Sequence, residues 1–313
     1  MLSERVAAID CGTNSIRLLI AAGPPPLRDV HREMRIVRLG QGVDETHRFH
    51  PEALARTLAA VRDYAEIIHA SGAGRIRFAA TSAARDAENR EQFLGGVEAI
   101  LGVRPEVISG PEEARLSYAG AARILPASAR AIVVDLGGGS TEFVIADDGA
   151  PLARSIDVGS VRLTERHLRS DPPTPGEVAA AREDVRAHLT GALRGVRWEG
   201  IEEVVGVAGT ITTVTAHALG LSLYEPDKIN GARLDVARVE AACADLVGRS
   251  RAERRSLGFL HPGRVDVIGG GALIWQEILR HLTDRFAAAG NAMSHVVTSE
   301  HDILDGLALS LLR

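Results

Sequence analysis

The chain carries the same short pattern twice: an apolar run, an aspartate, a turn rich in glycine and hydroxyl residues, and a second apolar run. The copies are VAAIDCGTNSIRLLIA (residues 6–21) and AIVVDLGGGSTEFVIA (residues 131–146). Both keep the order Asp-x-Gly-x-x-Ser, so Asp10 corresponds to Asp135. Apolar runs on either side of a glycine-containing turn predict two β-hairpins. Their repetition in a chain of 313 residues predicts two similar halves.

The segments after each hairpin alternate between strand and helix patterns. A third strand is expected to end near Gly40–Gly42, and a helix begins at Pro51. In the second half, Thr174 is the expected cap of a helix with proline at its first position. Residues 265–282 (VDVIGGGALIWQEILRHL) are expected to form a strand, a glycine turn and a helix. This alternation predicts an α/β protein with a duplicated βββαβα plan.

The predicted halves define two domains. We expect the first to comprise residues 1–120 together with a C-terminal helix at 299–313, and the second to comprise residues 121–298. A helix around 112–124 is expected to connect them.

Composition excludes several classes of protein. A net charge of −5 argues against a generally basic surface for nucleic acid. The longest apolar runs are shorter than the ~20 residues that a membrane span needs, and the first residues have no signal-peptide pattern. Two cysteines do not form a disulfide framework. We therefore expect a cytoplasmic protein that binds neither nucleic acid nor a membrane.

The two turns have the chemistry of phosphate-binding loops. Successive backbone N–H groups in a glycine-rich turn can form an anion-binding nest, and nearby hydroxyl and amide side chains add donors. One such turn can be merely a tight turn, but two copies favour phosphate binding. The predicted phosphate-binding residues of the turns are Gly12, Thr13, Asn14, Ser15, Gly137, Gly138, Gly139, Ser140 and Thr141.

Each turn follows an aspartate, which would repel a phosphate chain unless a cation lay between them. Mg²⁺ is usually bound by one or two carboxylates together with substrate phosphates. Asp10 and Asp135 therefore predict a divalent metal ion, Mg²⁺ or Mn²⁺.

The paired hairpins resemble the phosphate-binding motifs of the actin, sugar kinase and heat-shock chaperone superfamily. That resemblance implies two actin-like (ribonuclease H-like) domains flanking a central cleft. The segments AATSAARDAEN (79–89), VISGPEEARLSYAGA (107–121) and GVAGTITT (206–213) narrow it to the exopolyphosphatase and guanosine pentaphosphate phosphohydrolase family. The length of the chain resembles the short, two-domain form of that family, which favours short polyphosphate chains or a nucleotide as substrate.

The resemblance also assigns roles to carboxylates. It places the catalytic base at Glu113, the second acidic residue of a predicted helix, and leaves Glu112 structural. On spacing alone, both could simply complement the helix dipole. By resemblance Asp135 and Glu142 hold the metal ion and orient water, with Asp10 assisting, although Glu142 could equally lie on a solvated strand face.

Three further residues complete the predicted phosphate site. Arg85 and Asn89 follow a predicted buried strand, where open α/β sheets bind ligands and where a guanidinium can fork onto phosphate. Gly209 lies at a predicted helix start, which attracts anions. The alternatives are a surface charge for Arg85 and close helix packing for Gly209. His301 is expected in the capping region of the last helix.

The expected activity is the Mg²⁺-dependent release of terminal phosphate from inorganic polyphosphate by water that Glu113 activates. Removal of the 5′ γ-phosphate of guanosine pentaphosphate is the alternative in the same family. A sugar or acid kinase is less favoured, since the sequence shows no acceptor-pocket signature, and so is a non-catalytic actin-like nucleotide-binding protein. The resemblance also implies a homodimer.

Overall fold

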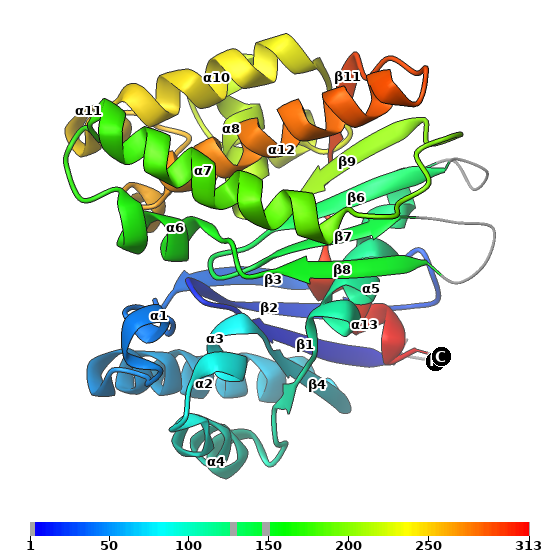
Figure 1. Ribbon diagram of the computed structural model, residues 1–313. Coiled ribbons are helices and arrows are strands. Elements are labelled where there is room, and N and C mark those ends of the chain that lie inside the picture. The colour runs from blue at the N-terminus through cyan, green and yellow to red at the C-terminus, as the bar shows by residue number, and fades with distance from the viewer. Residues whose placement is uncertain (1–3, 126–129, 146–150, 313) are drawn as a thin grey trace. The chain divides into compact units, whose positions relative to one another are not determined.

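The computed structural model describes residues 4–125, 130–145 and 151–312 (Figure 1). Ala146, the last residue of the second predicted hairpin, lies outside these ranges. The chain divides into two compact units. The first contains the chain up to Gly120 and from Asp302 onward, and the second runs from Ala121 to His301. Within the described ranges, no helix has the length and apolar character needed to cross a bilayer.

The first unit is built on a five-stranded sheet in the order β3-β2-β1-β4-β5. The first three strands pair antiparallel, whereas β4 and β5 run parallel to β1. The carboxyl ends of β1, β4 and β5 therefore lie at one edge of the sheet. The strands are β1 (Arg5–Cys11), β2 (Ser15–Ala22), β3 (Arg28–Ile36), β4 (Arg75–Ala80) and β5 (Glu106–Val107).

Helices cover both faces of this sheet. Alternate residues of β1 face opposite ways, so Ala7 and Ile9 join a core with α2 and α4, while Val6 and Ala8 pack with α13. Side chains of a strand alternate between the two faces of the sheet, so Asp10 points to the same face as Val6 and Ala8. This is the face that α13 covers. The helices are α1 (Val43–Thr46), α2 (Pro51–Ser71), α3 (Ser82–Asp86), α4 (Arg90–Leu101), α5 (Gly110–Ala121) and α13 (Ile303–Ser310), with a short 3₁₀ turn at Ala122–Ile124.

The second unit repeats the topology of the first. Its sheet has the order β10-β11-β9-β6-β7-β8, so β8-β7-β6-β9-β11 corresponds strand for strand to the first sheet, and β10 is an addition. This correspondence confirms the predicted duplication and the α/β class. The strands are β6 (Ala131–Leu136), β7 (Thr141–Ile145), β8 (Leu152–Ile156), β9 (Glu203–Val207), β10 (Arg233–Asp235) and β11 (His295–Thr298).

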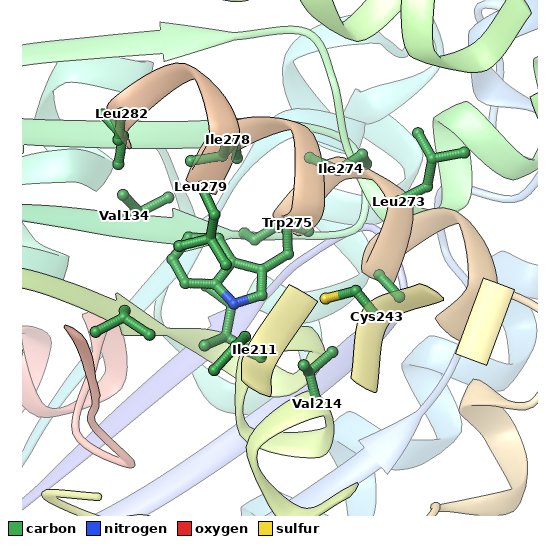
Figure 2. Close-up of a cluster of buried hydrophobic side chains, with 14 of the residues drawn as sticks. Val134, Ile211, Val214, Cys243, Leu273, Ile274, Trp275, Ile278, Leu279 and Leu282 are labelled. Atoms are coloured by element: carbon green, nitrogen blue, oxygen red, sulfur yellow. The ribbon is translucent and has the colours of Figure 1, made fainter. Parts of the chain in front are cut away.

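One hydrophobic core organises the second unit around helix α12 (Ile268–Ala288). Trp275 of α12 is fully buried, and Figure 2 shows it beside Ile211, Val214 and Cys243. α12 packs against α6, α7, α8 and α10. The other helices are α6 (Ser160–His167), α7 (Pro175–Ala192), α8 (Ala208–Leu219), α9 (Pro226–Ile229), α10 (Val236–Gly248) and α11 (Arg251–Arg255), with a 3₁₀ turn at Pro262–Arg264.

The predicted helix starts at Pro51 and Thr174 agree with the structure, whereas the predicted end of the third strand does not. Thr174 caps α7 as predicted: its side chain accepts the Glu177 N–H at 3.3 Å, and Glu177 binds back in a capping box. The side chain of Asp302 caps the last helix, and His301 directly precedes it, within the predicted capping region. The third strand ends at Ile36, because the following residues turn away to bind the first hairpin.

The expected strand at the start of residues 265–282 is wrong. The three glycines lie in the first turn of α12, and the element directly before that helix is the 3₁₀ turn at Pro262–Arg264 rather than a strand. A Cβ on Gly269 would lie 2.2 Å from Nη2 of the buried Arg254, and a Cβ on Gly270 would lie 2.3 Å from Oγ1 of Thr164. These glycines allow close packing at a helix start, which a sequence pattern does not distinguish from a loop.

Candidate functional site

The first predicted phosphate-binding loop is a tight turn whose carbonyl groups accept hydrogen bonds from the chain segment after β3. The N–H of Gly12 donates to the carbonyl of Ser15 at 3.0 Å and closes the turn. The segment 37–40 donates three N–H groups to the carbonyls of Thr13 and Asn14, at 2.8 to 3.0 Å. Because C=O and N–H of a trans peptide point in opposite directions, the N–H of Asn14 points away from that segment.

The second loop repeats this arrangement. The N–H of Gly137 donates to the Ser140 carbonyl at 3.0 Å, and the backbone N–H groups of residues 160–162 donate to the carbonyls of Gly137 and Gly138 at 2.8 to 3.2 Å. Arg162 Nε donates to the Gly139 carbonyl at 2.7 Å. The carbonyls of residues 137–139 thus point toward the segment that contains α6. Because C=O and N–H of a trans peptide point in opposite directions, the N–H groups of residues 138–140 point away from that segment.

Several polar atoms of the two loops have no partner that the structure describes. Among residues 4–125, 130–145 and 151–312, none accepts a hydrogen bond from the N–H of Gly138 or Gly139. Thr13 Oγ1 and Asn14 Oδ1 are buried and likewise have no partner within those ranges. Buried polar groups normally have partners, so unpaired donors in a glycine-rich turn indicate an anion-binding nest.

Two glycines that the sequence analysis missed support the loops. A Cβ on Gly159, just before α6, would lie 2.4 Å from the carbonyl carbon and oxygen of Gly138. A Cβ on Gly40 would lie 2.4 Å from Cγ2 of Thr13. Each glycine follows the third strand of its unit and lets the chain lie directly behind the turn. The signal available in the sequence was a glycine shortly after each third strand.

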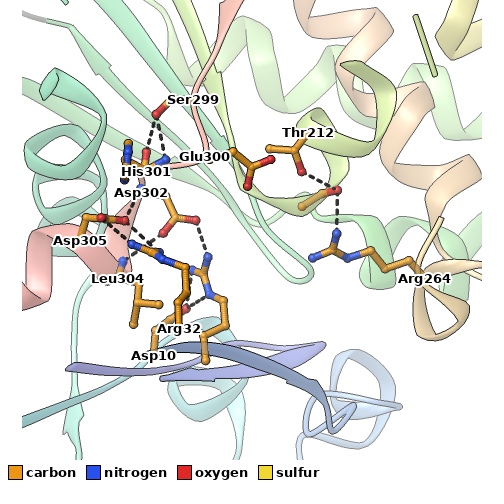
Figure 3. A network of polar contacts seen from close by, with 12 residues as sticks. Asp10, Arg32, Thr212, Arg264, Ser299, Glu300, His301, Asp302, Leu304 and Asp305 are labelled. Carbon is orange, nitrogen blue, oxygen red and sulfur yellow. Dashed lines mark hydrogen bonds and ion pairs between the residues drawn. The ribbon is translucent and has the colours of Figure 1, made fainter. Parts of the chain in front are cut away.

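Asp10 is at the end of β1 and is paired with arginine. Arg17 lies opposite it on β2 and donates to Asp10 Oδ2 from Nε at 2.9 Å and from Nη2 at 2.6 Å. Arg17 also contacts the carboxylate of Asp302, the cap of α13, which Figure 3 shows close to Asp10. Burial raises the pKa of Asp10, and Arg17 partly offsets this effect. Asp10 is therefore a restrained carboxylate rather than one freely exposed to solvent.

Glu113 and Glu112 have different surroundings although they are adjacent in α5. Glu113 is buried, and Arg85 Nη1 donates to its Oε2 at 2.7 Å. Burial raises the pKa of Glu113, whereas Arg85 and Thr81 act in the lowering direction. Glu112 is instead only half-buried, and its Oε1 pairs with Arg77 Nη2 at 3.1 Å.

The parallel strands of the first unit bring these groups to one edge. Asp10 ends β1, Thr81 and Arg85 follow β4, and Glu113 follows β5. Ligands of open α/β sheets bind at the carboxyl ends of the strands. A buried carboxylate, an arginine and a phosphate-binding turn at the same edge form the arrangement expected of a site that hydrolyses a phosphate ester or anhydride.

Asp135 and Glu142 form the corresponding carboxylate pair of the second unit. They are direct register partners on β6 and β7, and their residues are only 6% and 1% exposed. The Ser155 hydroxyl donates to Glu142 Oε1 at 2.7 Å. Like charges placed opposite each other in a sheet destabilise it, so a cation near this pair would be favourable.

The donor set suits a metal ion that substrate helps to bind. In the described ranges there is no group of three or more His, Cys, Asp or Glu side chains arranged to hold a metal ion. Two carboxylates are nevertheless sufficient for Mg²⁺, which takes its other ligands from water and substrate phosphates.

Two predicted phosphate-binding residues have structural partners. The amide of Asn89 clamps the backbone of Phe49, accepting from its N–H at 2.8 Å and donating to its carbonyl at 3.1 Å. The hydroxyl of Thr141, fully buried in β7, donates to the carbonyl of Val158 at 2.7 Å. Both side chains thus stabilise the segments around the site.

Gly209 lies under the guanidinium of Arg264. Arg264 Nη1 donates to the Gly209 carbonyl at 3.2 Å, and a Cβ on this glycine would lie 2.1 Å from Nη2 (Figure 3). Close to it, Tyr224 OH lies 2.7 Å from Thr212 Oγ1 and 2.6 Å from Glu300 Oε1. The cluster lies at the carboxyl ends of β9 and β11. Of its members Gly209 was predicted from the sequence, whereas Tyr224 and Glu300 were not, because they lie far from it in the chain.

Comparisons with known proteins agree with the fold and the motifs. The Ppx/GppA phosphatase family matches residues 19–301. Exopolyphosphatase 2 of Mycobacterium tuberculosis is 51% identical over 322 aligned positions, covering 99% of each chain.

Solved structures give the same result. The crystal structure of an exopolyphosphatase-like protein matches with a TM-score of 0.94 and 46% identity, covering 99% of this chain and 98% of the other. The Aquifex aeolicus member of the Ppx/GppA family matches with a TM-score of 0.79 and 29% identity, covering 99% and 97% of the two chains. Together with the duplicated sheets, these matches confirm the actin-like fold that the paired hairpins implied. The chain belongs to the Ppx/GppA phosphatase family.

Proposed function

We propose that this protein is an exopolyphosphatase that hydrolyses the terminal phosphoanhydride bond of inorganic polyphosphate. The observation that carries the proposal is Glu113, a buried carboxylate held by Arg85 at the same sheet edge as the first phosphate-binding turn. Full-length similarity to a protein named Exopolyphosphatase 2 supports the same activity.

In the proposed mechanism, the backbone N–H groups of the two turns bind phosphate oxygens, and Arg85 adds a guanidinium. Glu113 accepts a proton from water as the water oxygen attacks the terminal phosphorus. The bond from that phosphorus to the bridging oxygen breaks, and the shortened chain leaves with the bond's electron pair. Positioning and charge stabilisation account for most of the catalysis of phosphoryl transfer, which agrees with a site made largely of backbone donors.

We further propose that Asp135 and Glu142 hold a divalent metal ion, Mg²⁺ or Mn²⁺, with Asp10 as an additional ligand in the presence of substrate. The ion, when bound, would neutralise charge on the phosphate chain. The buried pairing of Asp135 with Glu142 supports this assignment most strongly, whereas Arg17 already engages one oxygen of Asp10.

Inorganic polyphosphate is the proposed substrate, and guanosine pentaphosphate is the alternative because it presents a similar phosphate chain to the same turns. The experiment is to measure phosphate release from polyphosphates of defined length, with guanosine pentaphosphate and ATP in parallel. We expect the highest kcat/KM on short polyphosphates. A higher value on guanosine pentaphosphate would select the alternative, and phosphoryl transfer from labelled ATP to glucose or glycerol would indicate a kinase.

Cytoplasmic location and homodimer formation stay predictions. Size-exclusion chromatography with light scattering would measure the oligomeric state directly. The same measurement with ATP present would detect the growing assemblies expected of a filament-forming actin-like protein.

A further inference from the structure

The start of helix α6 holds the second glycine-rich turn. The first N–H groups of an α-helix have no partner inside the helix. In α6 the N–H groups of residues 160–162 donate instead to the carbonyls of Gly137 and Gly138, at 2.8 to 3.2 Å. The N–H of Leu163 forms the first hydrogen bond of the helix itself, at 2.9 Å. The free N–H groups of the helix are therefore all used before the carbonyl of Gly139 is reached.

The carbonyl of Gly139 is bound by a side chain instead. Arg162, the third residue of α6, donates to it from Nε at 2.7 Å and is half-buried. Among residues 4–125, 130–145 and 151–312, no backbone N–H donates to this carbonyl. Arg162 thus completes with its guanidinium a row of three bound carbonyls, of which the backbone of α6 binds the first two.

The first turn holds the equivalent carbonyl in a different way. Asn14 has the place of Gly139 in the repeated Asp-x-Gly-x-x-Ser pattern. Its carbonyl accepts two backbone N–H groups, from Val37 at 3.0 Å and from Arg38 at 2.8 Å. At this point the first turn is fixed by backbone groups, whereas the second turn depends on the side chain of Arg162.

The hydrogen bond from Arg162 fixes the orientation of one peptide of the turn. The C=O of Gly139 and the N–H of Ser140 belong to that peptide and point in opposite directions. Glycine adopts either sign of φ readily, so Gly138 and Gly139 allow the peptide to rotate. A rotated peptide would direct a carbonyl oxygen toward a bound phosphate, which would repel it. Arg162 therefore selects the orientation in which an N–H faces the phosphate.

We propose that Arg162 is a positioning residue, whose Nε–H orients the peptide between Gly139 and Ser140 for phosphate binding. This inference rests on the proposed function, in which the second turn binds phosphate oxygens. The Gly139 carbonyl points toward α6, so its bond to Nε lies on the side of the turn opposite to the N–H groups. Arg162 therefore acts through the backbone rather than as a direct phosphate ligand.

The test compares two side chains of similar length. In glutamine, Nε2 is separated from Cα by the same number of atoms as Nε in arginine, so Arg162→Gln keeps a donor for Gly139 without the charge. Arg162→Met removes both the donor and the charge. We expect Arg162→Met to raise the KM for polyphosphate about 10- to 100-fold, with a smaller effect on kcat, and Arg162→Gln to recover most of the lost affinity. An equal increase in both variants would indicate a charge contact with phosphate and would overturn the inference.

Arg166→Met is the matched control. Arg166 lies in the last turn of the same helix, where its Nη1 pairs with Asp184 Oδ2 at 3.5 Å. The control removes an arginine from α6 and leaves the bond to Gly139 in place, so its KM should stay near that of the wild type. The same increase in KM in both methionine variants would contradict the proposed role of Arg162. Arg162→Ala also lacks the donor and is used if Arg162→Met does not fold.

Calorimetric titration with a methylene-bridged triphosphonate separates this inference from the proposed function. This analogue of tripolyphosphate cannot be hydrolysed, so the titration measures binding without turnover. If the wild type releases no phosphate from polyphosphate, but Arg162→Met weakens binding of the analogue and Arg162→Gln does not, the proposed function is wrong and the role of Arg162 stands. If the wild type hydrolyses polyphosphate and Arg162→Met binds the analogue as tightly as the wild type, the proposed function stands and the inference about Arg162 is wrong.

Discussion

Asp135 faces Glu142 across β6 and β7, at the same place in the second hairpin where Asp10 faces Arg17 in the first. The duplicated hairpins thus differ in the charge of one cross-strand partner. In the first unit the arginine compensates the aspartate, with its Nη2 2.6 Å from Asp10 Oδ2. In the second unit two carboxylates are buried opposite each other, an arrangement that a cation would stabilise. This register is the reason for proposing the second hairpin as the main source of metal ligands.

Metal ions should stabilise the second unit through this pair. A ligand that binds only the folded state raises its stability, so Mg²⁺ or Mn²⁺ should raise the Tm of the wild-type protein. The increase should disappear in Glu142→Gln and persist in Glu202→Gln, which changes an exposed carboxylate of the same unit. Differential scanning fluorimetry with and without EDTA measures the metal-dependent change in Tm of each protein. A full metal-dependent increase in Glu142→Gln would contradict the assignment.

Glu113→Gln should abolish turnover while substrate binding survives. Glutamine keeps the shape of the side chain but cannot accept the proton from water, and general-base catalysis typically contributes 10²- to 10⁴-fold to the rate. Single-turnover phosphate release measures the rate, and calorimetric titration with polyphosphate measures binding. The neighbouring Glu112→Gln changes a half-buried carboxylate that pairs with Arg77; it serves as the control and should remain active.

The rate should depend on pH through Glu113. The base works only when ionised, so kcat should fall as the pH is lowered through the pKa of Glu113, which burial raises above its usual range. Arg85 acts in the opposite direction and lowers that pKa. Arg85→Gln should therefore move the acidic limb of the kcat profile to higher pH, and Arg85→Lys, which keeps the charge, should move it less. An acidic limb at the same pH in all three proteins would exclude Glu113 as the titrating group.

Gly159→Ala should damage the second turn. The new methyl group would lie 2.4 Å from backbone atoms of Gly138, so the turn must shift, and overpacking of this kind typically costs about 1–3 kcal/mol. We expect a lower free energy of unfolding and a higher KM for polyphosphate. Gly176→Ala, in helix α7 of the same unit, meets no atom within 4 Å and should be neutral or slightly stabilising. Denaturant titration measures the free energy of unfolding of the two variants, and steady-state kinetics measures their KM for polyphosphate.

Asn89→Ala should destabilise the first unit without weakening substrate binding. The substitution removes two hydrogen bonds to the backbone of Phe49, which together are worth on the order of 1–3 kcal/mol. The free energy of unfolding and the KM for polyphosphate are measured on the same preparation of each protein. A large increase in KM with unchanged stability would instead support the sequence-based prediction that Asn89 binds phosphate.

The hairpins, the duplicated plan and the helix cap at Thr174 could be predicted from sequence because each depends on residues close together in the chain. Alternation of apolar residues marks strands, and a glycine turn between two of them marks a hairpin. The repeated Asp-x-Gly-x-x-Ser therefore indicates both the architecture and the two candidate phosphate-binding loops.

Only the tertiary structure decided which side chains meet. Arg17 reaches Asp302, Arg85 binds Glu113, and the side chain of Asn89 binds the backbone of Phe49. The partners in these contacts are separated by 28 to 285 positions. Sequence spacing carries no information about them, because the order of strands in the sheet determines which segments become neighbours. The three glycines at the start of α12 were predicted to form a turn for the same reason. Their actual role depends on side chains from distant segments that pack against them.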